Sequence, residues 1–171
     1  MKNNLSKRIQ SQFNILGIYQ IGGGIIGLGL VVWLSSGLRA ITLLLVIILL
    51  VAIALYSYSI YCGILLLRKN IFGVRLSLVN QFLQLFSLSI FGFTFQYTSG
   101  AFFSVGFDLT NSFLFTFNLG ISQWQLTIND NKELLIVNFN IVALFLILFI
   151  ERLRKEIQKE QVKRRIASIG Q

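Results

Sequence analysis

The sequence predicts an integral membrane protein, mainly α-helical, with four transmembrane helices and a small antiparallel β-sheet inserted between helices 3 and 4. Of the 171 residues, 55% are apolar and only 12% are charged, about half the charged share of an ordinary soluble domain. Residues 13–67 hold a single charged residue, Arg39. Between residues 91 and 128 apolar side chains alternate with polar ones, which is the period of a strand.

Two long apolar stretches at the start of the chain predict the first two spans. Residues 14–34 would reach about 31 Å as a helix, enough to cross a hydrocarbon layer of about 30 Å. Residues 35–37 interrupt the apolar sequence, and a second run of 28 residues follows from 40 to 67. Gly23 and Gly27 form a GxxxG pair in the first span, which allows close approach of another helix, either the second span or another subunit.

Two weaker apolar runs predict the third and fourth spans, at about residues 76–90 and 134–150. The third run carries a polar stripe, which consists of Asn80, Gln81, Gln84 and Ser87. Amide side chains in hydrocarbon need partners, so we expect this stripe to face the helix bundle. There it would form hydrogen bonds between helices or line a path for a polar ligand or water.

The segment between the third and fourth spans predicts short antiparallel strands. The alternation marks residues 91–98, 103–110, 113–119 and 124–128, and an Asn-rich turn follows at 129–131. One face of this sheet would be aromatic and would consist of Phe93, Phe95, Phe103, Phe107, Phe113, Phe115, Phe117 and Trp124. Because an open sheet leaves backbone groups unpaired in hydrocarbon, we expect it outside the bilayer core. The helix bundle, lipid, a second copy or a protein partner would cover its aromatic face.

The start of the fourth span is open in the sequence. Residues 133–139 also alternate and can form a strand that pairs back across the Asn-rich turn. The fourth helix then begins either near residue 134 or near residue 140.

The basic residues predict the orientation of the chain in the membrane. With four spans, 13 Lys and Arg residues lie on the side of the two termini and only Arg39 and Lys132 on the other, so both termini are expected in the cytoplasm. A composition rich in Asn, Lys, Ile and Phe and free of Pro favours a bacterial inner membrane.

The predicted chain has three parts. They are an N-terminal interfacial helix with transmembrane helices 1–3 (1–90), an extracytoplasmic sheet (91–133), and transmembrane helix 4 with a basic tail helix (134–171). In the tail, Lys163, Arg164 and Arg165 are candidates for contact with anionic lipid.

The composition argues against most catalytic chemistry. The chain has no His, one Cys (Cys62) and six acidic residues outside the apolar cores, so we expect no cofactor and no protein-only metal site. A nucleophile would lack an activating base, and basic residues at the ends of apolar segments favour membrane orientation over nucleic-acid binding. We therefore expect a non-catalytic accessory, assembly or scaffolding subunit that binds another membrane or envelope component. The alternatives are an oligomeric pore or small permease and, third, a lipid-modifying enzyme; a homo-oligomer is consistent with the first two.

Overall fold

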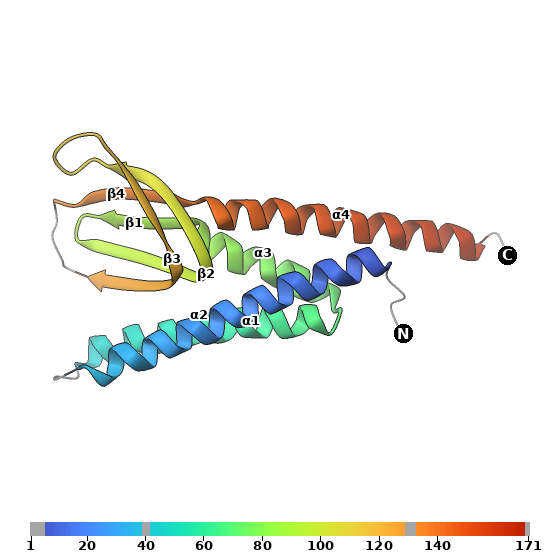
Figure 1. Ribbon diagram of the computed structural model, residues 1–171, viewed down its shortest axis with the longest axis horizontal. Coiled ribbons are helices and arrows are strands. Elements are labelled where there is room, and N and C mark those ends of the chain that lie inside the picture. The colour runs from blue at the N-terminus through green and yellow to red at the C-terminus, as the bar shows by residue number, and fades with distance from the viewer. Residues whose placement is uncertain (1–5, 39–41, 129–132, 170–171) are drawn as a thin grey trace.

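The structure, a computed structural model, describes residues 6–38, 42–128 and 133–169, with the side chains of residues 164, 168 and 169 excepted. The elements of this part are α1 (Lys7–Ser36), α2 (Leu43–Leu67), α3 (Ile71–Leu85), β1 (Phe86–Ile90), β2 (Phe93–Asp108), β3 (Leu114–Ile128), β4 (Leu135–Asn140) and α4 (Ile141–Ile169). Helices α1 and α2 form an antiparallel hairpin, the sheet lies beside one half of this hairpin, and α4 extends past the other half (Figure 1).

The prediction of four transmembrane helices is wrong. Within the described residues only α1 and α2 are long and apolar enough to cross a membrane, judged by length and composition. Helix α3 has 15 residues, and at about 22 Å it is shorter than a hydrocarbon layer of about 30 Å. Helix α4 is long enough, but its charged residues begin at Glu151, only ten residues after its start.

The third apolar run fails as a span because it changes from helix to strand. Helix α3 ends at Leu85, and Phe86–Ile90 forms β1, which pairs with β4. Serine alternates with apolar residues in this stretch, which is the period of a strand. Ser87 therefore lies in the sheet opposite Asn138 and does not belong to the polar stripe of the helix. The helical stripe is corrected to Asn80, Gln81 and Gln84.

The sheet takes up more of the chain than the predicted segment 91–133. It extends from Phe86 to Asn140. The first two predicted alternations merge into the 16-residue β2, the next two merge into the 15-residue β3, and the last, at 133–139, forms β4. The predicted turn at 129–131, Arg39 and Lys132 lie outside the described residues.

Asn140 sets the boundary between β4 and α4. It is the last residue of the strand, and its Oδ1 accepts hydrogen bonds from the N–H groups of Val142 at 3.1 Å and Ala143 at 3.3 Å. These bonds satisfy backbone donors that the start of a helix leaves unpaired. Of the two starts that the sequence allows for the fourth helix, the structure has the later one.

The antiparallel sheet curls until three of its four strands have neighbours on both sides. The strand order is β1-β4-β2-β3, and β1 also pairs with β2. Strand β2 makes this closure by bending: its first part pairs with β1 at Phe93, and its second part pairs with β4 at Val105. The bend coincides with a register shift against β3 between Thr98 and Ala101. Among the described strands, only β3 keeps an edge that pairs with no other strand.

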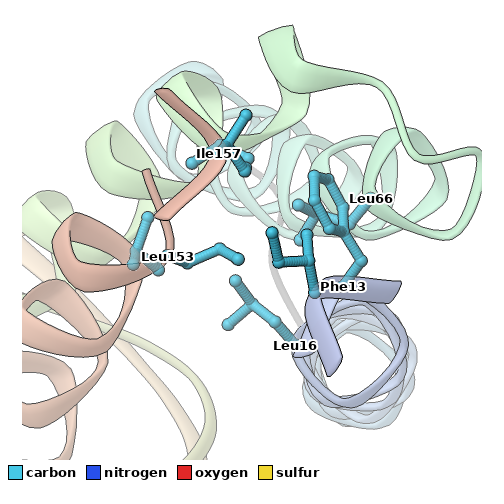
Figure 2. Close-up of a cluster of buried hydrophobic side chains, with 8 residues drawn as sticks. Phe13, Leu16, Leu66, Leu153 and Ile157 are labelled. Atoms are coloured by element: carbon cyan, nitrogen blue, oxygen red, sulfur yellow. The ribbon is translucent and has the colours of Figure 1, made fainter. Parts of the chain in front are cut away.

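Two buried apolar clusters hold these elements together. One joins all four helices near the start of α1 and consists of Ile9, Phe13, Leu16, Leu66, Val74, Ile150, Leu153 and Ile157 (Figure 2). The other lies between α1, α2 and the sheet and consists of Val31, Ala52, Tyr56 and Tyr97. In the second cluster the Tyr97 ring stands edge-on to the Tyr56 ring, with 5.4 Å between centroids. This contact fastens β2 to the helical hairpin.

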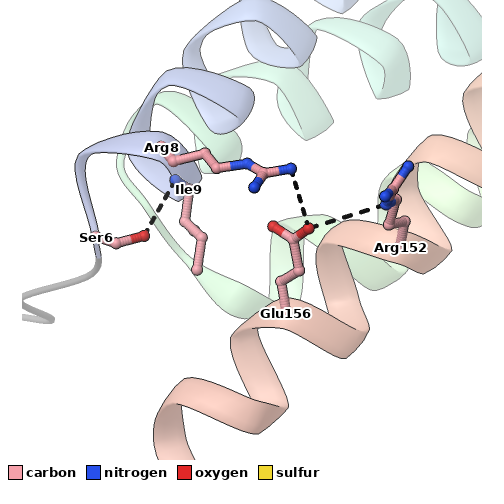
Figure 3. Close-up of polar contacts among 5 residues, drawn as sticks. All are labelled: Ser6, Arg8, Ile9, Arg152 and Glu156. Carbon is pink, nitrogen blue, oxygen red and sulfur yellow. Dashed lines mark hydrogen bonds and ion pairs between the residues drawn. The ribbon is translucent and has the colours of Figure 1, made fainter.

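Basic residues from three segments gather at the end of the molecule where α1 begins, which we call the basic end. Glu156 Oε1 lies 3.5 Å from Arg8 Nη2 and 3.9 Å from Arg152 Nε (Figure 3). Lys69, between α2 and α3, donates to the backbone oxygen of Gln10 at 3.1 Å. Partial burial there lowers the pKa of Lys69. These contacts hold the start of α1, the α2–α3 connection and the middle of α4 side by side at the basic end.

Candidate functional site

Polar side chains from three helices and two strands meet inside the molecule where β2 bends. We call this cluster the polar junction, and all its members are buried: Gln20, Ser59, Ser77, Asn80, Gln81, Gln84, Tyr97, Ser99 and Ser122. The predicted helical stripe thus forms one side of a larger cluster. None of its three amides faces the surface of the protein.

Ser59 of α2 lies at the centre of the polar junction. Its hydroxyl donates to the backbone oxygen of Gln20 at 3.1 Å and accepts from Asn80 Nδ2 at 3.1 Å and from Ser99 Oγ at 2.9 Å. These three bonds use the one donor and both acceptor positions of the hydroxyl. One side chain therefore connects α2 to α1, α3 and β2.

Two further contacts attach the bend of β2 to α2 and α3. The Tyr97 hydroxyl lies 2.9 Å from the Leu55 backbone oxygen and 3.1 Å from Asn80 Oδ1, and its proton is shared between them. Gln84 Oε1 accepts the backbone N–H of Ser99 at 2.8 Å. In a region of low dielectric constant such bonds are strong, and unpaired groups are costly. The buried amides of α3 therefore fix where β2 turns.

Helix α1 and the bend of β2 meet backbone to backbone. A Cβ atom on Gly23 would lie 2.3 Å from the nitrogen of Gly100, which itself has a φ of +100°. Ser122 Oγ accepts the Gly100 N–H at 3.0 Å and donates to the Gly23 oxygen at 3.0 Å. The predicted glycine pair is thus divided between two neighbours, because Gly27 packs against Tyr56 of α2 while Gly23 packs against the sheet.

Sequence reasoning missed six members of the polar junction: Gln20, Ser59, Ser77, Tyr97, Ser99 and Ser122. Gln20 could have been predicted as a buried polar contact, because a lone amide in an apolar stretch needs a hydrogen-bonding partner. Ser59 and Tyr97 carried little signal, since a single hydroxyl in an apolar helix or an aromatic residue in an alternating strand is ordinary.

Several amide atoms of the polar junction have no hydrogen-bonding partner among the residues that the structure describes. They are Gln20 Nε2, Gln84 Nε2 and both polar atoms of Gln81. An unpaired buried polar atom costs about 1–3 kcal/mol. These unpaired atoms therefore offset part of the stabilisation that the other hydrogen bonds of the polar junction provide.

The bend of β2 divides the predicted aromatic face into two parts. Phe95 and Trp124 pack on the second apolar cluster, with their rings edge-on at a centroid distance of 6.2 Å. The other part is exposed, and we call it the outer face. It consists of Phe103, Phe113, Phe115 and Phe117, which are 38%, 62%, 62% and 68% exposed, together with Leu119 and Ile121 at 77% and 61%. Of the remaining predicted members, Phe93 is exposed and Phe107 lies half-buried against Phe113 and Phe115.

The outer face carries no charged residue, and most of the hairpin beside it is also free of charge. Residues 9–38, 42–67, 86–107 and 113–128 contain none. At the far end from the basic residues, Asp108 closes β2, and hydrogen bonds from the side chain and N–H of Thr110 lower the pKa of its carboxyl group. Exposed apolar side chains thus cover the outer face and much of the hairpin, whereas the polar junction lies buried between them.

The predicted site of anionic-lipid contact lies on the last part of α4. Lys163 and Arg165 are exposed there, and the side chain of Arg164 lies outside the described residues. Lys163 lines a shallow depression together with Lys155, Lys159, Val162 and Ile166. The depression thus combines ammonium groups with an apolar floor.

No protein-family model, no curated protein and no solved structure matches this chain. In the part of the chain that the structure describes, no three His, Cys, Asp or Glu side chains are placed to hold a metal ion. Cys62 is buried in α2. The polar junction and the outer face are therefore the features from which a function is inferred.

Proposed function

We propose that this chain is a non-catalytic membrane protein that crosses the bilayer with α1 and α2 and binds another membrane component through its outer face. The observation that carries the proposal is the exposed apolar surface of the hairpin and the outer face around a buried polar junction. Lipid accepts exposed Phe, Leu and Ile side chains, whereas polar groups inside a membrane must find partners within the protein. The outer face meets the first requirement, and the hydrogen bonds of Ser59, Asn80, Tyr97 and Ser99 in the polar junction meet the second.

The contact between α1 and β2 supports a position of the sheet within the depth of the bilayer, in contrast to the position outside the bilayer core that we expected from the sequence. Phe13 lies at the basic end, with the Lys69 ammonium 5.9 Å from its ring centroid. Gly23 is ten residues further along α1, or about 15 Å, which is half of a hydrocarbon layer of about 30 Å. Because Gly23 touches the bend of β2, a hairpin that crosses the bilayer carries the sheet in the half away from the basic end.

The remaining helices suit the other half of the bilayer. Helix α3 and the uncharged start of α4, residues 141–150, lie between the sheet and the basic end (Figure 1). Phe145 and Leu148 on this part of α4 are 65% and 62% exposed, as expected for side chains in contact with lipid. The excess of Lys and Arg at the basic end then favours the cytoplasmic side for that end.

The outer face supports a binding role within the membrane. Its aromatic side chains provide wide contact areas with few rotatable bonds, which suits a binding surface. The sheet that carries this face is held to the helices by Ser59, Tyr97 and Gln84, so the face is presented on a rigid support.

Photocrosslinking in intact membranes tests this function. A photoreactive phenylalanine analogue replaces Phe113 on the outer face or, as the matched control, Phe95, which packs on the second apolar cluster. We expect the chain to require detergent for extraction and Phe113 to yield a discrete protein adduct that Phe95 does not. Extraction by alkaline carbonate alone, or identical products from both positions, would contradict the proposal.

A further inference from the structure

The outer edge of β3 is the one strand edge that the sheet leaves open in the described part of the chain. Strand β3 pairs with β2 along its length and with no other strand. Its first part, Leu114–Gly120, is exposed at nearly every residue. The helices touch β3 near its bend, where Ser122 bonds to α1.

Soluble proteins protect such an edge with Lys, Pro or inward-pointing charges. Residues 113–128 contain neither Lys nor Pro and carry no charge. Within hydrocarbon, an open edge leaves backbone N–H and C=O groups without any partner, and such edges do not occur there. If the sheet lies in the bilayer, as the proposed function states, the edge of β3 needs another strand beside it.

We propose that this strand is β3 of a second copy of the chain, which pairs antiparallel about a two-fold axis at Phe117. Phe117 then lies opposite its own counterpart, Phe115 lies opposite Leu119, and Thr116 lies opposite Asn118. Apolar residues then meet on the outer face, and Thr116 meets Asn118 on the other face, where Leu114 lies opposite Gly120. This register rests on the proposed location of the sheet in the bilayer.

The geometry of β3 limits the pairing to this first part of the strand. Ser122 has a φ of +48°, and the register shift against β2 lies next to it. The straight part of the strand therefore ends near Ile121, and Phe117 lies close to its middle. A shift by one residue would place the apolar residues of one copy on the polar side of the other.

The pairing also suits the side chains around it. Both strands are free of charge, so no like charges are brought together. The exposed rings of Phe115 and Phe117 would gain cross-strand contacts at Cβ distances of about 4.5–5.5 Å. A two-fold axis repeats each contact and closes the assembly at two copies.

Cysteine crosslinking with a short bifunctional thiol reagent in liposomes tests this register. All variants carry Cys62→Ser, and resistance to trypsin confirms that they are folded. We expect Phe117→Cys to crosslink to itself. Phe115→Cys and Leu119→Cys should each crosslink poorly alone, since like positions lie about 14 Å apart along the strand, but should crosslink at least tenfold more when the two are mixed. Phe103→Cys, on the inner strand β2 of the same face, should stay monomeric.

The results separate this inference from the proposed function. A membrane-impermeant maleimide is applied to the Phe103→Cys control in the same liposomes, and labelling there would show that the sheet lies in water. Protection of that thiol without any crosslink from the β3 positions would overturn the second-copy interface alone. Crosslinks from β3 that do not depend on the Phe115 and Leu119 combination, or equal crosslinks from Phe103→Cys, would also overturn it.

Discussion

The ring of Tyr56 occupies the space that a side chain at Gly27 would fill. A Cβ atom on Gly27 would lie 2.0 Å from Tyr56 Cε1. Tyr56 is fully buried and packs against Tyr97, so it has little room to move. Close packing of α1 on α2 and anchoring of β2 on the hairpin therefore depend on the same glycine.

Replacing this glycine should loosen both contacts. We expect Gly27→Ala to lower the free energy of unfolding by about 1–3 kcal/mol, because an overpacked core must shift. Gly29→Ala is the matched control, since nothing lies within 4 Å of a Cβ at that position. It should be neutral or stabilising by up to about 1 kcal/mol. Denaturant titration in mixed micelles measures both, and equal losses would refute the packing argument.

Ser59→Ala should weaken the polar junction. The change removes three hydrogen bonds and leaves Asn80 Nδ2 and Ser99 Oγ without their partner, so we expect a loss of about 1–3 kcal/mol. Ser35→Ala removes a single bond to Val32 at the exposed end of α1 and should change stability by less than about 0.5 kcal/mol. Thermal unfolding in detergent compares them; a Ser59 variant as stable as the control would show that the junction contributes nothing.

A feature of the fold could be predicted from the sequence only where residues close together in the chain determine it. Apolar length located α1 and α2, and alternation located most of β2 and β3. The end of α3 at Leu85 was not visible, because Phe86–Ile90 is apolar enough to continue a helix and its strand character depends on pairing with β4. The bend at Gly100 that joins two predicted strands into one depends on contacts with Gly23 and Ser122, which are distant in the sequence.

The same limit applies to the candidate site. Asn80, Gln81 and Gln84 were predicted because three amides in an apolar run need partners. The partners of Asn80 and Gln84 lie on α2 and β2, and neither spacing nor composition identifies them. The outer face was predicted as part of a longer aromatic set, but the bend of β2 decides which of its members the helices cover.

Leu153→Ala should show how much the first apolar cluster contributes. Leu153 is fully buried where α4 meets α1 (Figure 2), and its truncation leaves a cavity. We expect a loss of about 2–5 kcal/mol. Val162→Ala, at a position on α4 that is 56% exposed, should change stability by less than about 0.5 kcal/mol. If chemical denaturation gives similar values for the two variants, α4 is not docked as described.

Glu156→Gln should have a small effect that depends on salt. The carboxylate pairs with Arg8 and Arg152, whose side chains are 71% and 76% exposed, so water screens the pairs and the loss should stay below about 1 kcal/mol. Raising the ionic strength to about 1 M should remove the difference from the unchanged protein. A larger loss of stability that persists in salt would show that the ion pairs of Figure 3 are less exposed to water than described here.

The depth of Phe103 in a bilayer shows whether the sheet lies within the hydrocarbon layer. A nitroxide is attached to Phe103→Cys on the sheet and, for comparison, to Lys159→Cys on the charged part of α4, both in the Cys62→Ser background, and the proteins are placed in liposomes. We expect oxygen to relax the label on the sheet more strongly than a water-soluble nickel chelate does, and the label on α4 to show the reverse. Stronger relaxation by the nickel chelate at Phe103 would place the sheet in water and refute its proposed position in the bilayer.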